Sequence, residues 1–444
     1  MKRKNDLLDL SRSVVRRATK LGAQGTRVQL ERVRNSSVEW RDGQLDRLRE
    51  TTEQKLTATL FVDGRYAVNV TSDLRPEALD AFLAESVAGA RLLTPDPYRK
   101  LPDPDRFAAM YAGDLGQYDP DGSEAVTPVG RRRLARELEE AARSAPGADA
   151  IASVSTTASD ILGEDVIVTS NGMEGTSRST VFVTSAVAAV RDGEERKQRG
   201  YWRSVVLFRD RLAPAAEVGR EATRRALQAV GARPLPTGEY DCVIENMVAG
   251  RLLGHLQEAL AGNAIQQGRS FLGSRQGEEI ASPVLTLRDE PHLFGGFGSS
   301  AYDIEGMATR PRAIVERGVL RNFYLSVYYA GKLGLEPTTA SPSNLVIPQG
   351  ERDLDGLLTA MGNGILVTSF VGGNSNGATG DFSVGIKGLR IENGRPAEAV
   401  SEMNLSGNQI DFWRRLVEVG ADPNLMSSYR TPSLRFRAVQ FSGA

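Results

Sequence analysis

The sequence contains little of what most catalytic metal sites and disulfide-stabilised folds require. Among its 444 residues there are one cysteine and two histidines. A single cysteine, Cys242, cannot form an intrachain disulfide, which favours a reducing compartment. Zinc hydrolases usually need three protein ligands and prefer histidine, so this composition disfavours a complete zinc site. A magnesium or manganese site made only of carboxylates stays open.

Long apolar runs and a net charge of one sign are also missing. No stretch approaches the roughly 18 uninterrupted apolar residues that predict a membrane span, and the first residues lack a signal peptide's apolar core. The 55 Lys and Arg residues face 56 Asp and Glu residues, giving a net charge of −1. Such a balance provides no electrostatic footprint for nucleic acid or anionic lipid. We therefore expect a cytoplasmic protein that binds neither nucleic acid nor membrane.

Turn signals and periodicity divide the first half of the chain into three segments. Residues 1–94 predict a helix, an antiparallel meander with Asp-Gly turns, and a second helix. Residues 95–128 are rich in Pro and Asp and predict an extended connector, with one short helix near 107–111. Residues 129–235 predict a central α/β module whose strands include 204–208.

The remaining residues, 236–444, predict a β-rich domain with one long helix at its start. That helix is expected over 247–266, where leucines and alanines recur at helical spacing, and a last helix is expected at about 409–419. Between residues 362 and 394 there are nine glycines, a density typical of bulges and close backbone approach. The predicted fold class is therefore α+β.

Two patterns that could indicate a nucleophile do not meet the mechanism's other requirements. Residues 373–377 read Gly-Asn-Ser-Asn-Gly and match G-x-S-x-G, but no histidine follows residue 292 and a turn is predicted afterwards. Cys242 stands beside Val243 and Ile244, which is typical of a buried cysteine. No glycine-rich segment has the spacing of a phosphate-binding loop.

The polar candidates have ordinary structural interpretations. His255 is expected on the polar side of the long helix, away from its leucines. The run Arg131–Arg133, followed by Glu137, Glu139 and Glu140, predicts a solvated helix face with i,i+4 pairs. Four carboxylates could approach one another and would then form an unrecognised hydrolytic site, with solvated loops as the alternative; these are Asp289, Glu290, Asp303 and Glu305.

A series of short motifs in the third section carries a family resemblance. They are Gly268–Leu272 (GRSFL), Leu285–Leu287, Ser299–Gly306 (SSAYDIEG), Gly318–Leu320, Met361–Gly364, Thr379–Ser383 and Ile391–Gly394. Their order and spacing resemble the TldD/PmbA family, historically called modulators of DNA gyrase. The Asp-Gly hairpin module at 39–66 is similar as well, so the resemblance covers most of the chain.

The same resemblance implies where a metal site would lie. In that family the TldD-type subunit carries H-E-x-x-x-H on the helix that opens the third section, with an Asp five residues later. Aligned through Gly268 and Ser270, those positions here hold non-matching residues, namely Leu253, Gly254, Glu258 and Asn263. The family's further Cys ligand has no counterpart in residues 424–435. The chain is therefore similar to the PmbA or TldE-type subunit, which lacks the metal site.

The resemblance implies a function within a heterodimer. The expected partner is a TldD-like H-E-x-x-x-H subunit that holds the zinc and cleaves small or unfolded peptides, including leaders of peptide natural-product precursors. This chain is expected to bind no metal or cofactor and to be silent alone. Its glycine-dense stretch is expected to face an extended peptide or the partner, through Gly372, Gly373, Asn374, Asp381 and Ser383. A stand-alone peptide-binding or regulatory protein is the alternative to both enzyme hypotheses.

Overall fold

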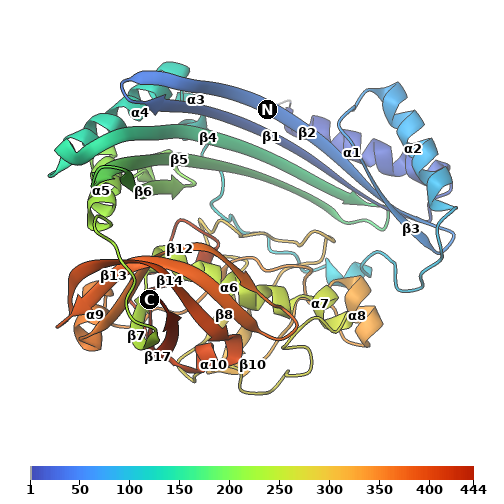
Figure 1. The fold of residues 1–444 in the computed structure, drawn as a ribbon. Helices are drawn as coiled ribbons and strands as arrows, with labels where there is room; N and C mark the ends of the chain where they lie inside the picture. Colours follow the sequence, from blue (N-terminus) through green and yellow to red (C-terminus); the bar gives the residue numbers. More distant parts are fainter. Residues whose placement is uncertain (1–2) are drawn as a thin grey trace.

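A computed structural model describes residues 3–444, in which a long curved sheet arches over a β-rich carboxyl-terminal domain (Figure 1). The arch is a six-stranded sheet in the order β3-β2-β1-β4-β5-β6, and all its neighbouring strands are antiparallel. Its strands are β1 (Gly25–Arg41), β2 (Gln44–Val62), β3 (Arg65–Thr71), β4 (Ile151–Thr169), β5 (Glu174–Asp192) and β6 (Arg196–Val206).

The expected Asp-Gly hairpins are confirmed. Asp42-Gly43 joins β1 to β2 and Asp63-Gly64 joins β2 to β3, with all four residues at positive φ. This is the backbone geometry that matches the twist of two antiparallel strands, and Asp and Gly adopt it at low cost. Because β1 also pairs with β4, the meander of the first segment and the strands of the central segment form one sheet.

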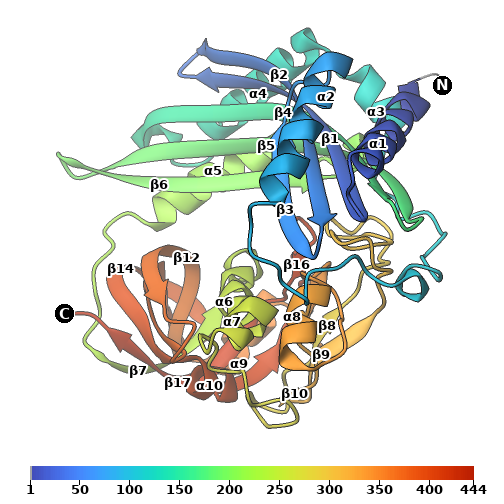
Figure 2. The ribbon, with the colours of Figure 1, turned by 90° about the vertical axis from the view of Figure 1, so that its right-hand side faces the viewer.

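Helices cover only one face of the arch. They are α1 (Arg3–Lys20), α2 (Pro76–Ala90), α4 (Pro128–Arg143) and α5 (Ala215–Gln228). Side chains alternate along a strand, so the even-numbered residues of β1 and β2, such as Val28, Leu30 and Leu60, are buried beneath α1 and α2. The odd-numbered residues point to the other face, which is turned toward the carboxyl-terminal domain (Figure 2).

The helix α4 differs from the expected solvated face at two positions. Arg133 and Arg136 do form exposed i,i+4 pairs with Glu137 and Glu140. However, Arg131 points inward and pairs with Asp160 on β4, and their side chains are only 11% and 8% exposed. Glu139 is also buried, and its carboxylate accepts hydrogen bonds from the backbone N–H of Gly43 at 3.0 and 3.1 Å. The prediction was wrong for these two because periodicity alone does not show which strand a helix meets.

The Pro-rich connector is extended as predicted and runs between the arch and the lower domain. It holds a short 3-10 turn η1 (Pro104–Arg106) and α3 (Pro120–Ala125), instead of a helix near 107–111. Its backbone bonds to both parts. The carbonyl of Gln117 accepts from Thr180 N–H of the arch, and that of Leu115 accepts from Gly295 N–H of the lower domain.

The carboxyl-terminal domain contains two sheets around one core. A six-stranded sheet has the order β14-β13-β12-β7-β17-β15, from β7 (Gly238–Ile244), β12 (Gly364–Ser375), β13 (Asp381–Glu392), β14 (Arg395–Asn408), β15 (Leu416–Val419) and β17 (Leu434–Ser442). A five-stranded sheet has the order β10-β9-β8-β11-β16, from β8 (Leu287–Asp289), β9 (Arg312–Glu316), β10 (Val319–Leu320), β11 (Leu345–Val346) and β16 (Tyr429–Arg430).

The two helices predicted in this domain are shorter than expected. The helices present are α6 (Asn246–Leu260), α7 (Gly262–Gln266), α8 (Val327–Leu333), α9 (Leu354–Met361) and α10 (Gln409–Arg414), of which α8 and α9 were not predicted. The long helix is interrupted at Ala261, which takes extended backbone angles and pairs with Tyr324. The last helix ends at Arg414, because Leu416 already joins β15 and pairs with Phe436. The chain is a mixed α+β protein, and none of the helices in residues 3–444 has the length and apolarity needed to span a membrane.

Candidate functional site

The helix α6 places the four degenerate motif positions in different surroundings. Leu252, Leu253 and Leu256 point into a core shared with apolar residues of both sheets, and Leu253 is 0% exposed. Gly254 is half-buried, and a Cβ there would meet no atom within 4 Å. Glu258 is exposed on the helix surface. Asn263 is exposed on α7, beyond the interruption at Ala261.

These four residues do not fit a zinc ion. A hydrocarbon and a glycine offer no donor atom, and Asn263 lies on a separate short helix, so Glu258 is left as a lone carboxylate. Within residues 3–444, no three His, Cys, Asp or Glu side chains come together so that they could hold a metal. Of the four positions at which the resemblance locates the metal site, Leu253 is a core residue and only Glu258 carries a carboxylate.

The polar side of α6 faces the end of the β12–β13 hairpin and the start of α10. Arg251 donates to the backbone carbonyl of Gly372 at 2.5 Å. His255 lies near the Phe382 ring, and its Nδ1 is 3.3 Å from Nε2 of Gln409. Burial lowers the pKa of His255, although the nearby Glu258 opposes this shift. The predicted polar-side position of His255 is confirmed, with a contact to a buried glutamine that the sequence did not indicate.

The turn after β12 is held by its own polar side chains. Asp381 accepts hydrogen bonds from the Thr379 hydroxyl at 2.7 Å and from Asn408 Nδ2 at 3.1 Å, which lowers the pKa of its carboxyl. Asn376 N–H donates to the Asp381 carbonyl at 2.8 Å. Asp381 therefore stabilises the turn, and its side chain is exposed.

The glycine-dense stretch forms the two paired strands β12 and β13. Its predicted bulges are confirmed, because the pairing of β12 with β13 slips at Val367/Ser369 and at Val371/Asn374. Gly372 and Gly373 lie at the second slip, with φ of 60° and 106°. A Cβ on Gly372 would meet nothing within 4 Å, whereas one on Gly373 would lie 2.6 Å from the Ser383 carbonyl oxygen.

The partner-facing candidates therefore divide into two groups. Asn374 and Ser383 face each other across the hairpin, and both are exposed, as is Gly372. These are positions where another chain could approach. Gly373 is close to the backbone of β13 itself, so a valine there would disturb the hairpin before it affected any partner.

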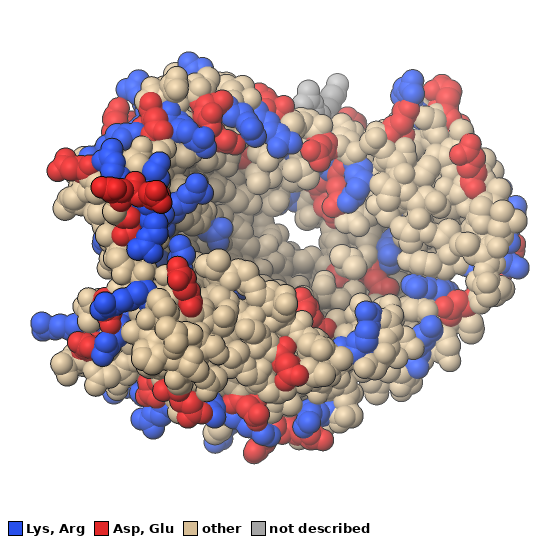
Figure 3. Space-filling model, in the orientation of Figure 1, with Lys and Arg blue, Asp and Glu red and all other residues tan. Residues whose placement is uncertain are grey.

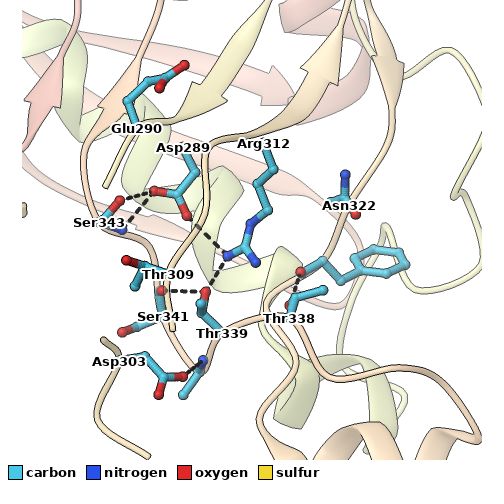
Figure 4. A network of polar contacts seen from close by, with 12 residues as sticks. Asp289, Glu290, Asp303, Thr309, Arg312, Asn322, Thr338, Thr339, Ser341 and Ser343 are labelled. Carbon is cyan, nitrogen blue, oxygen red and sulfur yellow. Dashed lines mark hydrogen bonds and ion pairs between the residues drawn. The ribbon is translucent and has the colours of Figure 1, made fainter. Parts of the chain in front are cut away.

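The four carboxylates singled out in the sequence each have polar partners in the fold, and Figure 4 shows the contacts of Asp289 and Asp303. Asp289 pairs with Arg312 at 3.1 Å and accepts from Ser343, and Glu290 pairs with Arg288 at 2.5 Å. The remaining two bond to the backbone. Asp303 accepts hydrogen bonds from the backbone N–H groups of Glu305, Met307 and Ala340. Glu305 accepts one from the N–H of Val327. Burial raises the pKa of both carboxyl groups.

The other sequence candidates have structural positions. Cys242 is fully buried in β7, and burial raises the pKa of its thiol well above the ordinary value. His292 stacks on the Tyr111 ring at 4.2 Å and bonds to the Thr309 hydroxyl at 3.1 Å. Ser375 ends β12 and is followed by a turn, so the strand-to-helix geometry of a nucleophile elbow is missing there.

Comparison with known proteins identifies the family. Three consecutive stretches match profiles described as PmbA/TldA metallopeptidase domain 1 (residues 27–90), central domain (119–230) and C-terminal domain (237–443). The chain belongs to the PmbA/TldD family. This confirms the resemblance carried by the motifs between Gly268 and Gly394.

Individual relatives agree along nearly the full length of the chain. Metalloprotease PmbA of Escherichia coli O157:H7 is 29% identical over 422 residues, covering 94% of this chain and 92% of that protein. A crystal structure from Bacteroides thetaiotaomicron, described as a putative modulator of DNA gyrase, superposes with a TM-score of 0.94 at 38% identity, covering 98% of both chains. TldE from Thermococcus kodakarensis has the same fold, with a TM-score of 0.85 at 19% identity, covering 98% of this chain and 100% of that one.

The structure also contains a feature that the sequence did not reveal. A cavity of about 650 Å³ lies between β6 and α5 of the arch and the sheet of the carboxyl-terminal domain. The sequence predicted only 204–208 of this edge strand, whereas β6 begins at Arg196. The signal was available as alternation, because Arg199, Tyr201 and Arg203 share one face of the strand.

Proposed function

We propose that this chain is the non-catalytic subunit of a PmbA/TldD-family zinc metallopeptidase that cleaves small or unfolded peptides, including leaders of peptide natural-product precursors. The observation that carries the proposal is the chemistry of α6. Where the family's catalytic subunit has two histidines and a general base, this chain has Leu253, Glu258 and Gly254. Burial of Leu253 makes the helix a packing element, so the zinc and its water belong to a partner subunit.

The exposed part of the β12–β13 hairpin supports a role in holding peptide. β12 pairs with β7 only over Ile365–Val367, so its later residues lack a strand neighbour on that side within the described chain. Such an edge can bind an extended peptide through backbone hydrogen bonds, which tolerate many side chains. Gly372 and Asn374 are exposed there, and a Cβ on Gly372 would meet no atom within 4 Å.

The test combines the purified chain with its H-E-x-x-x-H partner. We expect the mixture to co-elute on gel filtration and to cleave a quenched fluorescent unstructured peptide faster than the partner alone. Chelator should abolish that cleavage, and the chain alone should hold no stoichiometric zinc by atomic absorption.

Two results would contradict the proposal in different ways. Equal turnover with and without this chain, together with separate elution, would favour a stand-alone peptide-binding protein. About one zinc per isolated chain with chelator-sensitive cleavage would show that the chain carries its own catalytic site.

A further inference from the structure

The cavity between the two parts of the molecule follows the free edge of β6. Strand β6 is the last strand of the arch, and its outer edge has no strand neighbour in the described chain. The cavity is lined by Arg199, Tyr201 and Arg203 from one face of β6 and by Gly200 and Trp202 from the other. A space that touches both faces of an edge strand also exposes the strand's backbone. Figure 3 shows an opening through the molecule between the arch and the lower domain, with the two parts in contact on either side of it.

The lining is rich in cations without partners. Arg224 and Arg225 also line the cavity, but they are paired with Glu221 at 2.6 and 2.8 Å, and Arg225 pairs further with the buried Glu245. By contrast, three other cations that line it have no carboxylate within 4 Å among residues 3–444; they are Arg199, Arg203 and Lys387. Asp355, at the far wall, is the one lining carboxylate in the described chain apart from Glu245.

Arg203 is partly buried in the wall of the cavity. Its Nε is buried and has no hydrogen-bond partner within the described residues. The neighbouring Trp202 points to the opposite face of the strand, where the Arg225 guanidinium stacks on its ring at 4.2 Å. Because side chains alternate, anchoring Trp202 directs Arg203 toward the arch's uncovered face.

The spacing of these cations indicates the shape of the ligand. Arg199 and Arg203 are four residues apart on an extended strand, which separates their Cα atoms by roughly 13 Å. One small anion cannot bridge that separation, whereas an extended chain with acidic side chains at alternate positions can. Lys387 comes from β13 on the opposite wall, so it would contact such a chain from the other side.

We propose that this cavity binds an acidic, extended peptide segment along the free edge of β6, with Arg199, Arg203 and Lys387 receiving its carboxylates. The inference rests on the proposed peptide-handling function and adds the class of substrate sequence. It concerns a surface distant in sequence from α6, and it needs no metal.

The experiment measures binding to the isolated full-length chain by fluorescence anisotropy. The probes are two labelled seven-residue peptides that differ only in having Glu or Gln at alternate positions. We expect the Glu peptide to bind at least tenfold more tightly at low salt, and the difference to shrink with added sodium chloride, because screening weakens such contacts.

Three variants locate the site. Arg203→Gln and Lys387→Gln should each weaken binding of the Glu peptide about threefold to tenfold and leave the Gln peptide unchanged. Lys197→Gln is the matched control, because Lys197 is exposed on the same strand and does not line the cavity. It should leave both peptides unchanged, and melting curves should show that all three variants are folded.

Several outcomes would overturn the inference. These are equal affinity for the two peptides, an equal effect of the Lys197 control, and full competition by millimolar phosphate or succinate, which would indicate a small-anion site. None of these measurements uses the catalytic partner. A failure of the heterodimer to form would therefore be distinguishable from a failure of this cavity to bind acidic peptide.

Discussion

Two neighbouring residues of α6, Leu253 and Gly254, show how a motif position changes its role. Leu253 fills the core, and Gly254 leaves space open beside the helix. Neither could be assigned this role from the motif alone, since the motif reports only which donor atoms are missing. The apolar spacing of the helix did predict that Leu253 is buried.

Truncating Leu253 should destabilise the protein strongly. Because its side chain is completely buried, Leu253→Ala is expected to lower the free energy of unfolding by about 2–5 kcal/mol, through lost apolar contact and a residual cavity. His255→Ala should cost about 1 kcal/mol or less, since it removes one contact with Gln409. Denaturant melts of both variants provide the measurement, and equal midpoints would show that the helix is oriented differently.

Substitution of Gly254, in contrast, should stabilise the protein. Gly254 lies in the interior of α6 with ordinary helical backbone, where glycine is less favourable than alanine. Gly254→Ala should therefore stabilise the protein by about 0.5–1 kcal/mol, measured by the same melts. As a control, Gly262→Ala should destabilise it, because its Cβ would lie 2.9 Å from the Tyr329 Cβ. A loss of stability at Gly254 would contradict the open space seen there.

At the scale of elements, the β12–β13 hairpin and the α4–β4 contact were only partly predictable. Glycine density correctly predicted bulges in the hairpin, since a bulge needs unusual backbone angles that glycine adopts. It did not show which glycine faces solvent and which faces the neighbouring strand. Likewise, the charge pattern of α4 predicted its exposed pairs but not the inward Arg131, because the partner Asp160 is distant in sequence.

The two hairpin glycines should respond differently to substitution. Gly373→Ala is expected to destabilise the protein by about 2 kcal/mol or more, since its Cβ would collide with the backbone of β13 at a positive φ. Gly372→Asn should cost only a few tenths of a kcal/mol, because asparagine tolerates a left-handed backbone and the space is open. Thermal melts compare the two, and similar losses would argue against the observed register.

The buried ion pair of Arg131 and Asp160 should contribute more to folding stability than the exposed ion pairs on the same helix. Asp160→Ala leaves a guanidinium that is 11% exposed without its carboxylate, which is expected to cost about 3–5 kcal/mol. The control is Glu137→Ala, which removes an exposed i,i+4 partner of Arg133 and should change stability by less than about 0.5 kcal/mol. If urea denaturation gave similar losses of unfolding free energy for both variants, Arg131 would have to be solvated.

At the scale of the whole molecule, the arch and the lower domain meet through polar groups as well as through the connector. A small cavity of about 190 Å³ lies between them, lined by Gln29 and Asp165 of the arch and by Tyr302 and Asp303 of the lower domain. Burial raises the pKa of Asp165, and the charge of Glu31 adds to this, although Gln29 donates a hydrogen bond to it. At neutral pH, burying the charged form of Asp165 therefore lowers the stability of the folded state.

This contact should make stability depend on pH in a defined direction. The pKa of Asp165 is higher in the folded than in the unfolded state. Its contribution to folding stability is therefore fully present below the unfolded pKa and is lost as the pH rises through the folded pKa. Asp165→Asn keeps an acceptor for Gln29 without the charge, and it should raise the melting temperature at pH 7 relative to the natural chain.

That difference should shrink on acidification toward pH 4, as the natural carboxyl becomes protonated. Asp121→Asn, at an exposed position on α3, serves as the control and should show no such trend. A variant that melts lower than the natural chain at pH 7 would contradict the buried position of Asp165.

Four features follow from the amino-acid sequence alone: the family, the α+β class, the hairpins at Asp42-Gly43 and Asp63-Gly64, and the lack of ligand donors at Leu253 and Gly254. These are local properties, since a turn, a stripe or a ligand type is set by a few adjacent residues. Only the folded chain shows that two segments share one sheet through β1 and β4, and that β6 runs beside the carboxyl-terminal sheet. It brought Arg203 and Lys387, which are 184 positions apart in the sequence, to one cavity. Such contacts depend on how surfaces that are distant in the sequence pack together, and the local residue pattern does not show which surfaces will meet.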